Sequence, residues 1–194
     1  MLGLLFVVTG PSGAGKDSVI EKARELQLDF GMITTTTTRA MRPGEAEGNP
    51  YYFLQREEFE RRVQGGEFVE WAEVYGNLYG ATKIEVERVR KQHAVVIVRV
   101  DPQGARAYKK MIPETITLFI QPPSFEFLEK HLVDRATDSS EVIQQRLEVA
   151  KTELQNLHQW DYLIMNEEGK LHESAQALIS IVKQMSTKTF SVHK

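Results

Sequence analysis

Residues 10–16, with the sequence GPSGAGK, have the G-x-x-x-x-G-K spacing of a phosphate-binding loop. The loop follows an apolar run, Leu4–Thr9, and precedes a helical pattern, which is the context that such a loop requires. There, backbone N–H groups converge on phosphate oxygens and the helix start adds a positive dipole. Lys16 would add a point charge to the β- and γ-phosphates of a nucleotide. An ordinary glycine-rich turn would have no use for this lysine, so the pattern predicts a nucleotide site.

The residue after Lys16 departs from this pattern. A phosphate-binding loop places Ser or Thr there to hold Mg²⁺, whereas this chain has Asp17, followed by Ser18. A carboxylate is also a hard oxygen ligand and could bind the metal directly or through water. Alternatively, Asp17 only favours the first turn of a helix or is solvated. We therefore predict Mg²⁺ as the cofactor, with Asp17 as a candidate ligand.

A second candidate site lies in the polar segment that follows. Arg39 and Arg42 are three residues apart beside the threonine run Thr34–Thr38. Guanidinium forks suit phosphate oxygens, and hydroxyl groups add donors. Tyr51 and Tyr79 could each donate an O–H to the same phosphate. The spacing is consistent with an acceptor-phosphate pocket and equally with a surface loop that carries scattered arginines.

Several stretches follow one another along the chain in a fixed order, spanning roughly residues 5–185. They are GPSGAGK, TTTRAMRPGE, Tyr51-Tyr52-Phe53, GEFVEWAEVYGNLYG, VDPQG, DRATDSSEVIQQRL and YLIMN. Taken together, they resemble the guanylate kinase family. The resemblance implies transfer of the terminal phosphoryl group of ATP to GMP, which gives ADP and GDP, with these nucleotides as the small-molecule partners.

The resemblance also implies roles for individual residues. Glu70 would accept hydrogen bonds from the guanine N1–H and exocyclic N–H₂, and Thr35 stands where the family has a serine that contacts guanine. Adenine lacks this donor pair, so AMP would leave a buried Glu70 unpaired at a cost of roughly 1–3 kcal/mol. The expected catalytic residues are Lys16, Arg39, Arg135 and Arg146; the ATP-binding residues are Gly10, Pro11, Ser12, Gly13, Ala14, Gly15, Lys16, Asp17, Ser18 and Asn166; the GMP-binding residues are Thr35, Arg39, Arg42, Tyr51, Glu70, Tyr79 and Asp101.

Two further positions depart from the family pattern. Ala81 replaces a Ser or Thr that usually follows Tyr-Gly and contacts guanine, and Arg99 replaces an acidic residue. Because side chains alternate along a strand, Arg99 and Asp101 are predicted to share a face. We expect Arg99 to pair with Asp101 or with the acceptor phosphate.

Two alternative functions stay open. The Lys16-Asp17-Ser18 sequence also resembles that of ribose 1,5-bisphosphate phosphokinases, which do not share the full acceptor-pocket run. Guanylate-kinase-like domains also serve as non-catalytic binding modules, but these tend to lose the loop lysine and the lid arginines. This chain keeps Lys16, Arg135 and Arg146, which favours an enzyme.

Strand and helix patterns alternate along the chain and predict an α/β fold, a P-loop doubly wound parallel sheet with inserted nucleoside-monophosphate-binding and lid subdomains. We predict a single domain over residues 1–186, with a GMP-binding insertion at 34–82, a lid at about 123–150 and a frayed tail at 187–194. The expected strands are Leu4–Thr9, Ala94–Val100, Thr115–Ile120 and Tyr162–Met165, with short strand-like runs at Tyr51–Leu54 and Phe68–Val74 in the insertion; the expected helices are residues 15–27, Arg56–Val63, Lys83–Val89, Ser124–Val133, Glu141–Leu157 and Leu171–Met185.

Composition narrows the function classes. With 24 basic and 27 acidic residues, the net charge of −3 gives no global field that would attract nucleic acid or an anionic membrane. The chain has no cysteine, which excludes disulfides and thiolate catalysis. No basic segment precedes the first apolar run, so we interpret that run as a buried strand and not as a signal peptide. We therefore expect a cytoplasmic protein. We also expect it to be a monomer or a homodimer.

Overall fold

A parallel sheet forms the centre of the chain in the computed structural model, which describes residues 2–74, 76–134 and 140–191. The strand order is β10-β9-β1-β8-β2, and every neighbouring pair is parallel. Residues 5–9 of the central strand are buried on both faces, as its continuous apolar sequence predicts. This confirms the predicted α/β class. The strands are β1 (Leu4–Thr9), β2 (Gly31–Met32), β8 (Val95–Arg99), β9 (Ile116–Gln121) and β10 (Tyr162–Met165).

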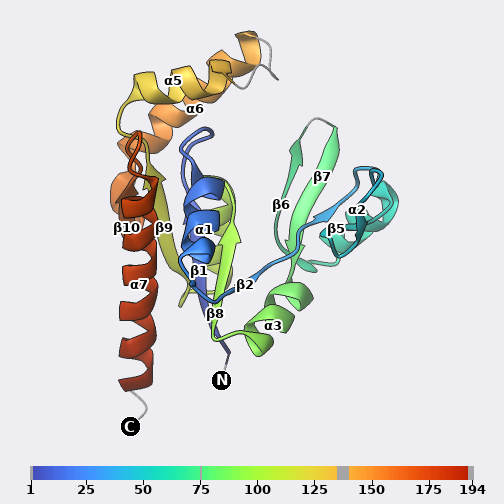
Figure 1. Cartoon of the computed structure of the whole chain (residues 1–194). Helices are drawn as coiled ribbons and strands as arrows, with labels where there is room; N and C mark the ends of the chain where they lie inside the picture. The colour runs from blue at the N-terminus through green and yellow to red at the C-terminus, as the bar shows by residue number, and fades with distance from the viewer. Residues whose placement is uncertain (1, 75, 135–139, 192–194) are drawn as a thin grey trace.

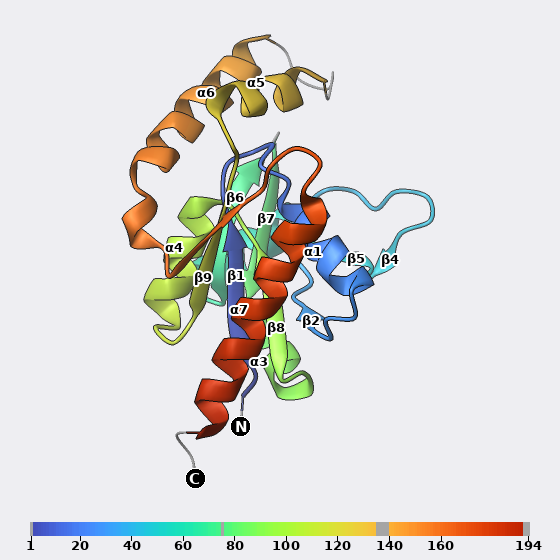
Figure 2. The ribbon, with the colours of Figure 1, turned by 60° about the vertical axis from the view of Figure 1, so that its left-hand side comes forward.

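Helices cover both faces of this sheet. Helix α1 (Lys16–Glu25) packs beside α7 (Leu171–Ser191) on one face (Figure 2). The β1 side chains Phe6 and Val8 belong to the hydrophobic core on that side. The intervening side chains of β1 face a second core beneath α3 (Lys83–Gln92) and α4 (Pro102–Met111).

A second sheet, with the order β4-β5-β3-β7-β6, stands apart from the first (Figure 1). Its own small core consists of Phe59 from α2 together with Phe68 and Leu78, so its hydrophobic contacts are partly independent of the main sheet. The elements of this unit are β3 (Thr36–Thr37), β4 (Ala46–Glu47), β5 (Pro50–Phe53), α2 (Arg56–Gln64), β6 (Phe68–Val74) and β7 (Asn77–Thr82).

A helical arm lies beyond the carboxyl end of the main sheet (Figure 1). It consists of α5 (Phe125–Asp134) and α6 (Ser140–Gln155), followed by a short 3₁₀ turn, η1 (Leu157–Gln159). Leu128 and Leu132 from α5 are fully buried, and Leu147 and Ala150 from α6 join the same core. Among the described residues, no helix has the length and apolarity needed to cross a membrane.

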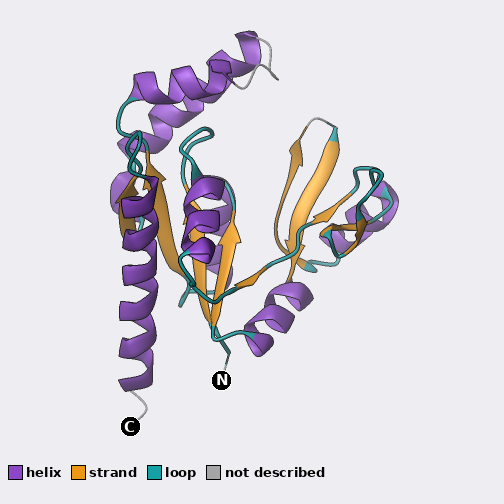
Figure 3. Cartoon of the chain, in the orientation of Figure 1, coloured by secondary structure: helices purple, strands orange, loops and turns teal. Residues whose placement is uncertain are grey.

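The structure differs from the sequence prediction in several elements (Figure 3). Helix α4 is absent from the prediction, although Asp101 caps it and Pro102 is its first residue, which is an ordinary helix-start signal. The short strands β2, β3 and β4, and the longer β7, are also absent from it. Helix α7 continues to Ser191, past the predicted end at Met185.

Candidate active site

The backbone of the loop between β1 and α1 packs closely against the Asn166 side chain. Gly15 has φ 85° and precedes the first residue of α1, a conformation that favours glycine. A Cβ at this position would lie 2.4 Å from the side-chain nitrogen of Asn166, which itself donates to the Ala14 carbonyl at 2.9 Å. The loop backbone and Asn166, both predicted from the sequence to bind ATP, are therefore in direct contact.

Lys16 is the first residue of α1, and its side chain folds back over this loop. Its ammonium donates to the carbonyls of Gly10 at 2.7 Å and Pro11 at 2.8 Å. Burial lowers the pKa of Lys16 to about 8, and the positive charge of Arg99 adds to the effect. A bound phosphate would supply the opposite charge and favour the protonated lysine.

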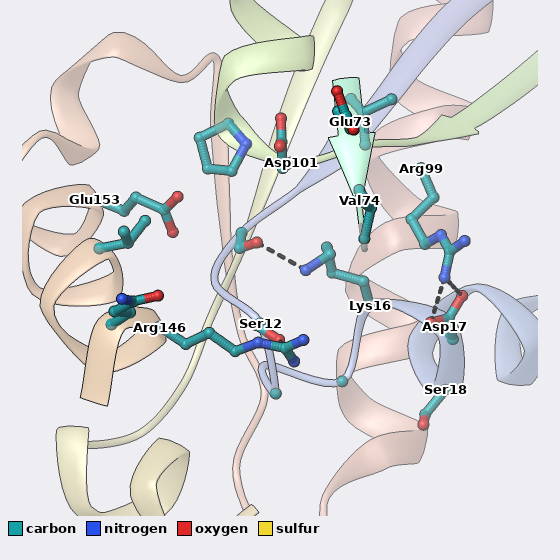
Figure 4. Close-up of a pocket in the computed structure, with 17 residues that line it drawn as sticks. Ser12, Lys16, Asp17, Ser18, Glu73, Val74, Arg99, Asp101, Arg146 and Glu153 are labelled. Carbon is teal, nitrogen blue, oxygen red and sulfur yellow. Dashed lines mark hydrogen bonds and ion pairs between the residues drawn. The ribbon is translucent and has the colours of Figure 1, made fainter. Parts of the chain in front are cut away.

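Asp17 and Arg99 form an ion pair at the mouth of the loop (Figure 4). The Arg99 Nη1 donates to both carboxylate oxygens of Asp17, at 2.5 and 2.6 Å. The expected pair of Arg99 with Asp101 is therefore wrong, because Asp101 lies beyond the end of β8. The Asp101 carboxylate instead caps α4 by accepting the backbone N–H of Gly104 at 2.7 Å.

A cavity of about 760 Å³ opens around the loop (Figure 4). The Nη1 of Arg146, from α6, donates to the Ser12 hydroxyl at 3.3 Å, so one predicted lid arginine already meets the loop. Arg135, the other predicted lid arginine, lies outside the described residues. Besides the loop, the walls come from the segment that joins β8 to α4 (Arg99, Val100, Asp101, Pro102), the tip of β6 (Glu73, Val74) and α6 (Gln145, Arg146, Val149, Glu153).

Glu153 brings an unexpected carboxyl group to the same cavity. Burial raises the pKa of this carboxyl to about 7, while the positive charge of Lys16 acts in the opposite direction. Asp101, on the opposite wall, raises the pKa of Glu153 further.

The predicted acceptor-phosphate residues gather in the second sheet. Nη2 of Arg39 donates to both carboxylate oxygens of Glu45, at 2.7 and 2.9 Å, and the guanidinium lies 5.4 Å from the centre of the Tyr51 ring. Tyr51 and Tyr79 meet edge to face, with ring centres 5.9 Å apart. Arg42 is exposed, and its backbone N–H donates to Glu45 at 2.8 Å.

The predicted guanine-binding carboxylate, Glu70, is the third residue of β6. Burial raises its pKa to about 7, and the negative charge of Asp101 contributes. The backbone N–H of Ala81 donates to this carboxylate and partly offsets the rise. Thr35 lies just before β3, where its carbonyl accepts the backbone N–H of Tyr52 at 3.0 Å. Glu70 and Asp101 are thus close enough for one charge to act on the other.

A family model described as guanylate kinase matches residues 3–185 of the chain. The chain belongs to the guanylate kinase family. A guanylate kinase from Idiomarina loihiensis is 44% identical over 170 residues, which cover 87% of this chain and 81% of that relative. One from Thermotoga maritima is 38% identical over 188 residues, covering 97% and 90%. The family expected from the sequence is confirmed.

The fold agrees with the guanylate kinase family as well. The crystal structure of guanylate kinase from Anaplasma phagocytophilum matches with a TM-score of 0.69 at 31% sequence identity. The match covers 95% of this chain and 87% of that structure, so both sheets and the helical arm contribute to it.

Two carboxylates that contact residues of the predicted acceptor site or their neighbours were missed in the sequence. Glu45 fixes Arg39, and the arginine-rich Pro-Gly turn around it was the available signal. Glu85 is buried and accepts the Tyr52 hydroxyl at 3.4 Å and the Arg88 guanidinium at 2.7 and 2.8 Å. Thr82 and Glu85 have the spacing of a helix-capping pair, in which the two residues bond to each other at the helix start. That spacing does not predict the contact of Glu85 with Tyr52, which is distant in the sequence.

Proposed function

We propose that the chain is a guanylate kinase that transfers the terminal phosphoryl group of ATP to GMP, giving ADP and GDP. The supporting observation is the position of Asp101. It lines the cavity around Lys16, and its charge also acts on Glu70 in the second sheet. A nucleotide on the phosphate loop and a guanine at Glu70 would therefore lie on either side of Asp101, within one continuous site.

Phosphoryl transfer requires in-line positioning and positive charge around the moving group. Lys16 and Arg146 provide positive charge from the donor side, and Arg39 would hold the phosphate of GMP. Arg135 is assigned a role here by the family resemblance alone. GMP already carries an anionic oxygen, so no protein nucleophile is needed. Water would be excluded as the helical arm and the second sheet close on the bound nucleotides.

Base selection would rest on Glu70. The ionised carboxylate offers two acceptors to the paired donors on guanine, whereas adenine would leave it unsatisfied. Asp101 and Thr35 complete the proposed guanine contacts. Ala81 brings no hydroxyl to this pocket, because its 1% exposed side chain is a methyl group.

We propose Mg²⁺ as the metal that accompanies ATP, since phosphates and water commonly supply most of its ligands. Asp17 is the protein ligand that the sequence predicts. However, both of its oxygens face Arg99, and the described residues contain no cluster of three or more His, Cys, Asp or Glu that could hold a metal. As placed, these residues do not fit a directly bound metal, and no step of the reaction is assigned to it.

Residues 34–82 would form the GMP-binding subdomain and residues near 123–150 the lid, within one domain that covers 1–186. The small-molecule partners would be ATP and GMP, with no nucleic acid or membrane involved. We propose a cytoplasmic monomer or homodimer.

A coupled ADP-release assay on the full chain tests the function. GMP should be phosphorylated far better than AMP, CMP or UMP, and Glu70→Gln should weaken its use by about 1–3 kcal/mol in transition-state terms. Equal use of AMP and GMP would refute the assignment. Use of ribose 1,5-bisphosphate without GMP would favour the phosphokinase alternative, and nucleotide-independent peptide binding without turnover would favour a binding module.

A further inference from the structure

Arg99 ends the strand next to the phosphate loop. Strand β8 runs parallel to β1, and Arg99 pairs in register with Val8, so its side chain reaches the same edge of the sheet as the loop. P-loop NTPases commonly hold Mg²⁺ between the Ser or Thr after the loop lysine and an aspartate from a neighbouring segment. In this chain a carboxylate, Asp17, follows the lysine, and an arginine ends the neighbouring strand.

The contact geometry places a cation against residue 17. Nη1 of Arg99 is 2.5 and 2.6 Å from the two Asp17 oxygens, so the guanidinium occupies the space that a metal bound to this side chain would need. Nε and Nη2 of Arg99 have no hydrogen-bond partner among the described residues. The three N–H groups on Nε and Nη2 are therefore available to a ligand. Arg99 lines the cavity together with Lys16.

The Arg99–Asp17 ion pair is not explained by a contribution to the stability of the fold. The Arg99 and Asp17 side chains are 43% and 68% exposed. An exposed ion pair of this kind contributes little net stability, because water screens the charges and side-chain entropy opposes the pairing. The pair does, however, hold a charged fork beside the phosphate loop, where it would meet a ligand.

We propose that Arg99 is a built-in cation of this active site, held by Asp17, which binds nucleotide phosphate oxygens at the place where P-loop enzymes hold Mg²⁺. This inference rests on the proposed function, because it takes the loop to bind ATP. It implies that ATP binds this chain with little dependence on Mg²⁺, since the arginine supplies the neutralising charge and three donors.

Calorimetric titration of the purified full chain with ATP, in EDTA and in excess MgCl₂, tests the inference without turnover. The wild type should bind ATP in EDTA nearly as tightly as in MgCl₂. Arg99→Ala should lose at least about tenfold in EDTA, because a charge-assisted contact is removed. Arg61→Ala is the matched control, since Arg61 pairs with Glu58 at 2.8 Å on the distant helix α2, and it should behave like the wild type.

Two further variants keep the test decisive if Arg99→Ala folds poorly. Arg99→Lys keeps the charge and should retain most of the affinity in EDTA. The double variant Asp17→Ser with Arg99→Asp recreates the ordinary metal arrangement, so it should bind ATP weakly in EDTA and recover in MgCl₂. Wild-type affinity in EDTA for folded Arg99→Ala, or a strong Mg²⁺ requirement in the wild type, overturns the inference.

The two proposals can fail separately. If the wild type phosphorylates GMP and Arg99→Ala binds ATP normally in EDTA, only the role of Arg99 is refuted. If Arg99→Ala loses ATP affinity in EDTA but the wild type does not phosphorylate GMP, only the proposed acceptor is refuted.

Discussion

The buried carboxylate of Glu85 accepts the backbone N–H of Thr34 at 3.2 Å and so joins helix α3 to the segment that carries Thr35. Glu85→Ala should leave this N–H without its partner and destabilise the fold by about 1–3 kcal/mol. Because Thr35 would be less well placed, the KM for GMP should rise more than kcat falls. Urea unfolding and initial rates measure the two effects. Glu87→Ala, on the exposed face of the same helix, should alter neither.

Guanine binding should depend on the protonation of Glu70. Its pKa of about 7 means that the free protein carries a largely neutral carboxyl below that pH, whereas guanine requires the ionised form. Affinity should therefore fall as the pH decreases from 8 to 6. Guanosine is the better probe, because the phosphate of GMP titrates in the same range. A pH-independent guanosine affinity in the wild type, equal to that of Glu70→Gln, contradicts this expectation.

Single substitutions should affect recognition of the base and of the phosphate of GMP differently. Arg39 lies against Tyr51 in the second sheet, while Glu70 is the third residue of β6. Arg39→Ala should weaken GMP binding by about tenfold or more, because a charge-assisted contact is lost, and should leave guanosine binding unchanged. Glu70→Gln should weaken both ligands. Equal losses for GMP and guanosine in Arg39→Ala would show that this arginine does not bind the phosphate.

Lys16 should take up a proton when ATP binds at alkaline pH. Since burial and Arg99 lower its pKa to about 8, the free lysine is mostly neutral at pH 9, and the phosphates restore its charge. Calorimetry in buffers of different ionisation enthalpy measures this uptake, which Lys16→Ala should abolish. The same variant should lose about a hundredfold or more in kcat while its melting temperature stays close to that of the wild type. Undiminished turnover would exclude a catalytic role for the loop lysine.

The second sheet and the helical arm should each close on their own nucleotide. Arg39 and Arg42 are carried by the second sheet, and Arg146 is carried by α6. GMP alone should slow backbone hydrogen exchange within residues 34–82, and a non-hydrolysable ATP analogue should extend the protection to α6. Strand β1, which is buried on both faces, serves as the internal reference. Identical exchange in free and doubly liganded protein would rule out closure.

The elements with strong local signals were predictable from the sequence. Strand β1 and the loop up to Lys16 depend on neighbouring residues alone, and the structure places them as predicted. Helix α4 was missed because Pro102 and Gly104 are poor helix residues, although Asp101 and Pro102 together mark a start. The strands β3 and β4 contain two residues each, too few for an alternating pattern to show.

Long-range side-chain partners were harder to predict. Strand alternation suggested that Arg99 meets Asp101, but the strand ends at Arg99 and the parallel neighbour brings Asp17 within reach. Glu85 and Thr34 are likewise far apart in the sequence and meet only in the folded structure. Such pairs depend on register and on helix position, which a single sequence specifies weakly.

The donor and acceptor halves of the site differ in how they could be transplanted. The phosphate cradle occupies one uninterrupted stretch, so a designer could graft β1, the loop and α1 onto another parallel sheet as a cassette. The proposed acceptor pocket has no such cassette, because the side chains assigned to it come from β5, β6, β7, the Arg39 turn and the cap of α4. Re-engineering this protein for another monophosphate would therefore require coordinated changes across these elements, whereas the ATP half could remain untouched.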